Sequence, residues 1–85
     1  MNYMFKKGDK IVTNMKSTVV YGTVLGKYEL NDIIVETTGQ NMYDIRLDEP
    51  YQWNGYKINM VSKYEIEMDF IEINPIINQI KEAYV

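Results

Sequence analysis

The sequence contains no cysteine and no histidine. Without cysteine the chain forms no disulfide and offers no thiolate to a metal, which suits the reducing cytoplasm. Without histidine it lacks the commonest general base and the commonest metal ligand of proteins. Zinc, haem and Ser-His-Asp chemistry are therefore not expected. The sequence predicts a protein that is not an enzyme and that uses no cofactor and no metal.

Long hydrophobic runs are also missing. No uninterrupted apolar stretch approaches the ~18 residues that a membrane span requires. At the N-terminus the apolar residues Met4 and Phe5 precede the charges of Lys6 and Lys7, which is the reverse of a secretory signal. We therefore expect a cytoplasmic protein that makes no membrane contact.

Acidic residues outnumber basic ones, twelve to nine, and the net charge is −3. The balance differs along the chain. Residues 1–28 hold five lysines against one aspartate, whereas residues 29–85 hold four basic residues against eleven acidic ones. This division predicts one basic and one acidic end, an arrangement that orients a partner without making the whole protein a polyanion binder.

Apolar residues make up 46% of the 85 residues, and eight tyrosines supply most of the aromatic content. This composition is far from that of a disordered chain, and the length is enough for one domain. We therefore expect a single domain over residues 1–85. Its tyrosines suit a pleated surface that is half exposed to water.

Short β-branched and aromatic segments separated by turn residues predict an all-β fold. Asn54-Gly55, between Trp53 and Tyr56, is the strongest short hairpin signal. Gly22 and Gly26 within the second segment indicate a bulge or a sharp bend. The expected strands are 10–14, 19–28, 33–37, 42–48, 56–61 and 65–70.

Two of these strands alternate clearly between apolar and polar residues. In the fourth strand the alternation places Tyr43, Ile45 and Leu47 on one face, and we expect Pro50 to end the strand because proline cannot donate to a ladder. A tight turn is expected over residues 62–64, with 3₁₀ geometry as one option. In the last strand the predicted outward residues are Glu65, Glu67 and Asp69, and the predicted inward ones are Ile66, Met68 and Phe70.

The C-terminal residues predict a short amphipathic α-helix over 75–85. Asn74 is a favoured N-cap and Pro75 a favoured first residue, and isoleucines recur on one side. This apolar side requires a cover. Either the helix packs on its own domain or it pairs with a second copy to form a homodimer.

Four short motifs carry a family resemblance: Lys-Gly-Asp-Lys-Ile-Val, Tyr-Gly-Thr-Val-Leu-Gly, Tyr-Asp-Ile-Arg-Leu-Asp and Val-Ser-Lys-Tyr-Glu-Ile-Glu. Residues 5–70 resemble an SH3-like barrel of the KOW and Tudor type. The resemblance implies a five- to six-stranded antiparallel barrel that binds partners, and in KOW-type relatives the opening loop helps to bind RNA or protein. The Asn-, Ile-, Tyr- and Lys-rich composition also resembles small phage or mobile-element proteins of low-GC bacteria.

Two groups of residues are candidates for partner contact. The basic group could contact phosphates, although a solvated turn explains it as well. The aromatic group could form a binding hot spot, although cross-strand packing is the alternative. The basic group is Lys6, Lys7, Lys10 and Lys16, and the aromatic group is Tyr51, Trp53 and Tyr56.

The acidic net charge and the surplus of aromatic residues favour a non-enzymatic protein-interaction module, such as a small regulator or inhibitor encoded by a phage or mobile element. Its contact surface is expected at the loops and strand faces around residues 6–10, 16–21 and 51–56. The alternative is a KOW-like module that binds RNA or DNA through the basic N-terminal hairpin. The carboxylates of the last strand, together with Asp44, Asp48 and Glu49, could suggest a cation site, but they lack the loop glycine and ligand spacing of an EF-hand. An acid-rich face could instead mimic nucleic acid or engage a basic protein surface.

Overall fold

The computed structural model describes residues 3–71, which form a five-stranded antiparallel sheet with one α-helix and one 3₁₀ helix. In chain order the elements are β1 (Lys10–Met15), β2 (Thr18–Lys27), α1 (Asn31–Thr38), β3 (Met42–Trp53), β4 (Tyr56–Tyr64), η1 (Glu65–Glu67) and β5 (Asp69–Phe70). The strand order is β4-β3-β2-β1-β5, so β5 returns to the edge of β1. The mostly antiparallel sheet confirms the predicted all-β class.

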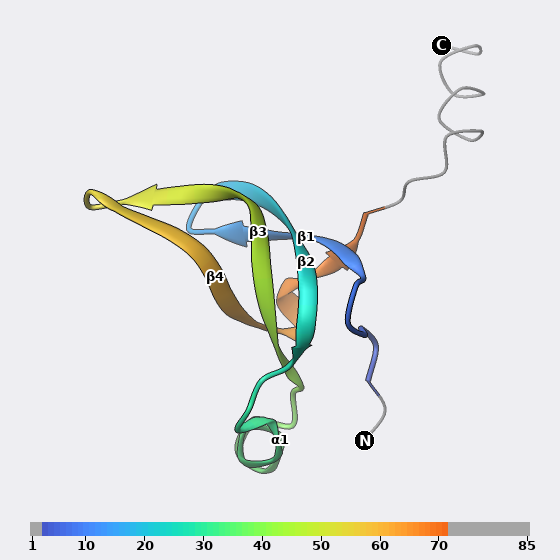
Figure 1. The fold of residues 1–85 in the computed structure, drawn as a ribbon. Helices are drawn as coiled ribbons and strands as arrows, with labels where there is room; N and C mark the ends of the chain where they lie inside the picture. The colour runs from blue at the N-terminus through green and yellow to red at the C-terminus, as the bar shows by residue number, and fades with distance from the viewer. Residues whose placement is uncertain (1–2, 72–85) are drawn as a thin grey trace, which may run out of the picture.

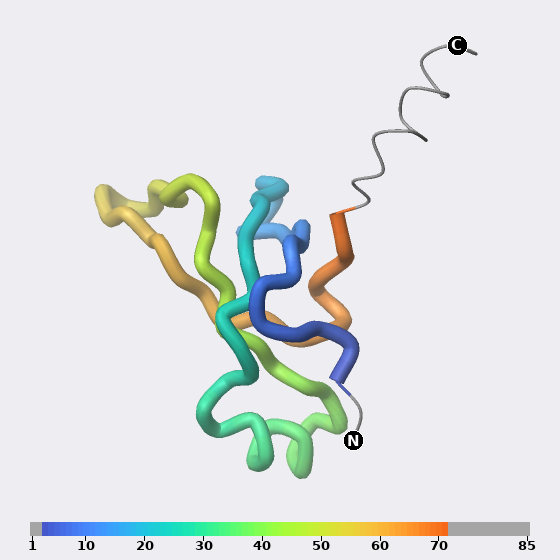
Figure 2. The backbone as a smooth tube through the Cα atoms, turned by 45° about the vertical axis from the view of Figure 1, so that its right-hand side comes forward, coloured from blue at the N-terminus to red at the C-terminus, as the bar shows by residue number. Residues whose placement is uncertain are grey.

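The sheet is strongly bent, and its two hairpins splay apart at one end while α1 lies at the other end (Figure 1). The tube view gives the same arrangement, with the β1–β2 and β3–β4 turns far from the helix (Figure 2). The core consists of Phe5, Ile11, Val24, Tyr43, Ile45, Leu47 and Met68, all buried. The face of the fourth strand that carries Tyr43, Ile45 and Leu47 is thus the buried one.

At Gly22, strands β2 and β3 approach each other closely. A Cβ at this position would lie 2.6 Å from Cγ2 of Ile45 and 2.7 Å from the carbonyl oxygen of Arg46. Only glycine allows this approach, because no real Cβ tolerates such contacts. A register shift between Val24 and Gly26 follows, which confirms the predicted bulge in this strand.

The predicted strand over 33–37 is wrong, because these residues lie in α1. Two signals favour the helix over the β-propensity of Ile33, Ile34 and Val35. Gly39 adopts a left-handed conformation (φ 73°) and its N–H donates to the carbonyl of Val35, which is a common helix C-terminus. The second signal is a tertiary contact at the first residue.

Asn31 anchors the start of α1 to the start of β3. Its side-chain oxygen accepts a hydrogen bond of 2.7 Å from the Met42 N–H, and its amide donates to Oδ1 of Asn41 at 3.2 Å. Asn31 and Asn41 are both buried, so their polar atoms need such partners. Tertiary hydrogen bonds of this kind override local strand preference.

The prediction that Pro50 ends the fourth strand is also wrong, because β3 continues to Trp53. Proline is tolerated here because the ladder between β3 and β4 breaks at this point. Arg46 pairs with Met60 and Tyr51 pairs with Ile58, so four residues of β3 lie opposite a single residue of β4. A bulge of this kind is one of the few strand positions that accept proline.

The predicted turn at 62–64 and the predicted long strand at 65–70 are corrected together. β4 extends to Tyr64, η1 follows, and β5 is only two residues long. Ile66, predicted to point inward, is 78% exposed, whereas Glu65 turns toward Tyr43. The prediction from alternation failed here because in a 3₁₀ helix every third side chain points the same way, whereas in a strand every second one does.

The predicted C-terminal helix over 75–85, with its possible role in a homodimer, lies outside the described residues. Within residues 3–71, no helix has the length and apolar character needed to cross a lipid bilayer.

Candidate functional site

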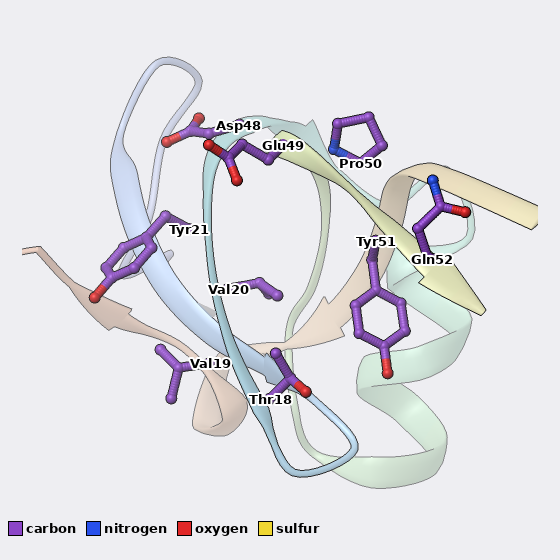
Figure 3. A pocket seen from close by; sticks show the side chains of 9 residues that line it. All are labelled: Thr18, Val19, Val20, Tyr21, Asp48, Glu49, Pro50, Tyr51 and Gln52. Carbon is purple, nitrogen blue, oxygen red and sulfur yellow. The ribbon is translucent and has the colours of Figure 1, made fainter.

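A groove of about 560 Å³ opens between the first half of β2 and the last half of β3. Figure 3 shows Val20 and Thr18 pointing into it from β2, and Tyr51 from β3, while Val19 and Tyr21 point away. Its lining is formed by Thr18, Val19, Val20, Tyr21, Asp48, Glu49, Pro50, Tyr51 and Gln52.

The groove exists because β2 and β3 stop pairing. Their ladder ends at the Gly22–Leu47 pair, so the residues before Gly22 and after Leu47 diverge. The first half of β2 stays paired with β1, from Lys10–Thr23 to Met15–Thr18. The end of β3 stays paired with β4. Each hairpin is therefore held internally, and the space between them stays open.

The floor of the groove is apolar and continuous with the core. Val20 and Tyr51, which line the groove, are partly buried and pack against the core cluster. A ligand that covers this floor would remove apolar surface from water at a place that already has a rigid support.

The rim on the β3 side is acidic. Asp48 and Glu49 are both exposed, and among residues 3–71 none of those that line the groove is basic. Lys10 lies beside this rim, with its Nζ 3.7 Å from Asp48 and 2.6 Å from the Thr23 hydroxyl. Exposed ion pairs of this kind contribute little to stability, so the rim keeps its capacity for another cation.

A side-chain contact links the two diverging hairpins at the open end of the groove. Lys16, in the β1–β2 turn, places its Nζ 4.7 Å from the centre of the Trp53 ring. Trp53 pairs with Tyr56 across the Asn54-Gly55 turn, where both turn residues have positive φ. The predicted hairpin is confirmed, and the two positive φ angles explain the preference for Asn-Gly.

The structure brings together one part of the predicted contact residues. Tyr51, Trp53, Tyr56 and Lys16 lie at the groove or at its open end, with Trp53 42% and Tyr56 71% exposed. Two sequence signals thus converge, the hairpin aromatics and the lysine of the opposite turn.

The other basic residues lie elsewhere. Lys6 and Lys7 belong to the exposed turn before β1, closed by a hydrogen bond of 3.0 Å from the Asp9 N–H to the Lys6 carbonyl. The Gly8 N–H donates a hydrogen bond to the Val24 carbonyl and so holds this turn beside Val24. Val24 belongs to the part of β2 that pairs with β3. It therefore does not line the groove, and Lys10 contacts the groove only through Asp48.

Sequence reasoning covered part of the lining, because residues 16–21 and 51–56 were expected at the contact surface. Asp48 and Glu49 were considered only as members of an acidic face, and Pro50 was not proposed as a contact residue. Pro50 was a usable signal, because proline inside an alternating strand indicates a bulge, and bulges redirect the following side chains. The groove itself had no local signal, since it depends on where two ladders separate.

A second polar cluster joins β3 to η1. The Tyr43 hydroxyl donates to Oε2 of Glu65, and the same oxygen accepts from the Asn41 amide at 3.2 Å and from the Met4 N–H at 3.3 Å. Burial raises the pKa of Glu65, but these hydrogen bonds outweigh burial and leave that pKa below its ordinary value. Burial, together with the hydrogen bond to Glu65, raises the pKa of Tyr43 to about 12.

The Tyr43 hydroxyl, the Asn41 amide and Oε2 of Glu65 all find hydrogen-bond partners within this cluster. Within residues 3–71, no group of three or more acidic, histidine or cysteine side chains is placed to hold a metal ion. The carboxylates considered above for a cation site do not share a strand face, because Glu65 and Glu67 lie in η1.

Comparison of the chain with models of known protein families, with curated proteins and with solved structures finds no match.

Proposed function

We propose that this chain is a non-enzymatic protein-interaction module of the SH3-like type, and that its contact surface is the β2–β3 groove with the aromatic residues at its open end. The observation that carries this proposal is the apolar floor of Val20 and Tyr51, which is continuous with the core and left uncovered between two hairpins. A cytoplasmic role as a small regulator or inhibitor of phage or mobile-element origin fits the composition.

The strand order supports the SH3-like assignment. Four strands follow one another as antiparallel neighbours, a 3₁₀ helix separates β4 from β5, and β5 returns to pair with β1. A bent sheet of this order resembles the small barrel that the motifs indicate. Such barrels bind partners with loops and strand ends, which is where the groove lies.

The chemistry of the surface favours a protein partner. Exposed Trp and Tyr beside an apolar floor are the residue types that dominate protein-binding hot spots. The acidic rim opposes a nucleic-acid backbone, since phosphates would meet Asp48 and Glu49.

The test compares proteins retained from a lysate of the source organism by immobilised wild type and by two double variants. The Tyr51→Ala/Trp53→Ala variant lacks the aromatic side chains in the groove and at its open end. In Ile33→Ala/Ile66→Ala two exposed apolar residues outside the groove are removed. We expect some lysate proteins to be retained by wild type and by the Ile33/Ile66 variant but not by the Tyr51/Trp53 variant. Circular dichroism should show that all three proteins are folded. Identical retention by all three would reject the groove as the contact surface.

The KOW-like alternative, RNA or DNA binding through Lys6, Lys7 and Lys10, stays a prediction. Of the basic candidates, Lys10 already forms an ion pair with Asp48, and Lys16 contacts the Trp53 ring. Single- and double-stranded probes at low salt test it. Binding that weakens steeply with salt and falls in Lys6→Glu/Lys7→Glu would favour nucleic acid over protein as the partner.

A further inference from the structure

One edge of β2 has no strand partner beside the groove. The Val24 N–H donates to the Asp9 carbonyl at 2.9 Å, and the Val24 carbonyl accepts from the Gly8 N–H at 2.8 Å. The backbone groups of Val24 thus face the chain segment that leads into β1. Because consecutive residues of a strand direct their backbone groups to opposite edges, Val19 and Tyr21 direct theirs to the other edge.

This other edge is the one that pairs with β3 further along. Thr23 uses it to pair with Arg46, but the ladder ends at Gly22–Leu47. Within residues 3–71, no strand pairs with this edge at Val19 and Tyr21. Two N–H and two C=O groups are therefore available there, at the spacing of about 6.6 Å that an extended peptide matches. Open strand edges of this kind accept an added strand.

We propose, on the basis of the protein-interaction function above, that the groove receives an extended, basic segment of the partner protein, which pairs with β2 at Val19 and Tyr21. One apolar side chain of this segment covers the floor formed by Val20 and Tyr51. A lysine or arginine of the segment lies beside Glu49.

Charge complementarity identifies the segment as basic. Glu49 is exposed and, within the described part of the chain, has no ion-pair partner. Asp48, next to it, holds only the exposed Lys10. Lys16 lies over Trp53 at the open end of the groove. Asp48 and Glu49 follow Leu47 directly, so the acidic rim lies near the other end, where β2 and β3 begin to pair. The basic residue is therefore expected toward the Gly22–Leu47 end.

The first experiment measures binding of synthetic peptides to the full chain. The probes are a blocked heptapeptide of alternating valine and lysine, its valine and glutamate counterpart, and two N-methylated forms of the lysine peptide with methyl groups on the odd or the even residues. N-methylation removes main-chain donors from one edge and keeps the side chains. We expect the lysine peptide to bind, the glutamate peptide to fail, and one methylated form to bind about tenfold more weakly. Equal binding of both methylated forms would reject strand pairing.

The matched pair Glu49→Lys and Glu36→Lys tests the basic side chain. Both changes alter the net charge equally at an exposed position, but Glu36 lies on α1 at the far end of the molecule. We expect Glu49→Lys to weaken binding of the lysine peptide by about threefold or more, and Glu36→Lys to have little effect on that binding. Equal effects would show that net charge, rather than the groove, attracts the peptide.

Amide hydrogen exchange gives a readout that needs no variant. The Val19 and Tyr21 N–H groups should exchange about tenfold more slowly when the lysine peptide is bound, because they become paired. The Val20 N–H faces β1 and should change little. Unchanged exchange at Val19 and Tyr21 under saturating peptide would reject the inference.

The outcomes separate this inference from the proposed function. Suppose that the Tyr51→Ala/Trp53→Ala variant no longer retains lysate proteins, but that no peptide slows amide exchange at Val19 and Tyr21. The interaction function then stands and strand pairing is wrong. Protection of the two amides without peptide, in a species of twice the monomer mass, would identify a second copy as the occupant and overturn the basic segment. Protection by an oligonucleotide instead of a peptide would overturn it in favour of nucleic acid.

Discussion

The hydroxyl of Tyr43 donates a hydrogen bond to the carboxylate of Glu65 and so joins the central strand β3 to η1. The same carboxylate oxygen also accepts from Asn41 and from the backbone of Met4, and the Tyr43 hydroxyl accepts from the Phe5 N–H at 3.4 Å. One acid thus connects the N-terminal segment, β3 and η1. These segments surround the core, on which the groove floor rests.

Acid should weaken the fold through Glu65. Hydrogen bonds to the ionised form lower its folded pKa, so its contribution is present above the unfolded pKa of about 4.5 and is lost as the pH falls through the folded pKa. We expect Glu65→Gln to destabilise the protein at pH 7 by about 1–3 kcal/mol and to reduce the loss of stability between pH 6 and pH 3. Urea unfolding at both pH values measures this. Glu36→Gln, on the exposed side of α1, is the control and should keep the wild-type acid dependence.

Alkali should act through Tyr43. Its pKa is raised from 10.0 to about 12, so the neutral phenol is favoured in the folded state. Its contribution is fully present below pH 10 and is lost as the pH rises toward 12. We expect Tyr43→Phe to cost about 1–2 kcal/mol at pH 7, and the difference from wild type to shrink above pH 10. A difference that stays constant from pH 7 to pH 11 in denaturant titrations would contradict this assignment.

Gly22→Ala should destabilise the protein by about 1–3 kcal/mol, because the new methyl group overlaps Ile45 and the carbonyl oxygen of Arg46. Leu25→Ala in the same strand removes an exposed side chain and serves as the control, with an expected change of about 0.5 kcal/mol or less. Chemical denaturation of the three proteins measures the effect. Since Gly22 also marks the closed end of the groove, Gly22→Ala should weaken partner binding as well.

Lys16→Gln should alter the environment of the single tryptophan with little effect on folding. The contact of Lys16 with the Trp53 ring is exposed, and such cation–π contacts contribute about 0.5–1 kcal/mol. We expect a change in Trp53 fluorescence and a loss of stability within that range. Lys57→Gln, in β4, is the control for the loss of one positive charge. Identical spectra for wild type and Lys16→Gln would show that the contact is not formed in solution.

Local pattern predicted the central part of the fold. The alternation of the fourth strand separated Tyr43, Ile45 and Leu47, which are buried, from the residues of its other face, and Asn54-Gly55 identified its hairpin. These features follow from period-two burial and from the φ angles of a two-residue turn, both of which are encoded within a few residues.

The prediction failed where tertiary contacts outweigh local preference. Ile33-Ile34-Val35 favours a strand by composition, but Asn31 binds the start of β3 and Gly39 ends a helix. Glu65 to Phe70 alternates like a strand, but Tyr43 and Asn41 draw Glu65 inward and a 3₁₀ turn results. The groove could not be predicted either, because it depends on the residue pair at which one ladder ends.

The sequence by itself determined that the protein is an all-β domain without cysteine or histidine chemistry, and that Tyr51, Trp53, Tyr56 and Lys16 are candidates for contact. Composition and short-range periodicity suffice for such conclusions, because each depends on residue type or on neighbours along one strand. Only the tertiary structure placed Lys16 over Trp53 and opened the edge of β2 at Val19 and Tyr21. The close approach at Gly22 and the bulge at Pro50 make the two hairpins diverge, and this divergence is a property of the folded sheet rather than of any one segment.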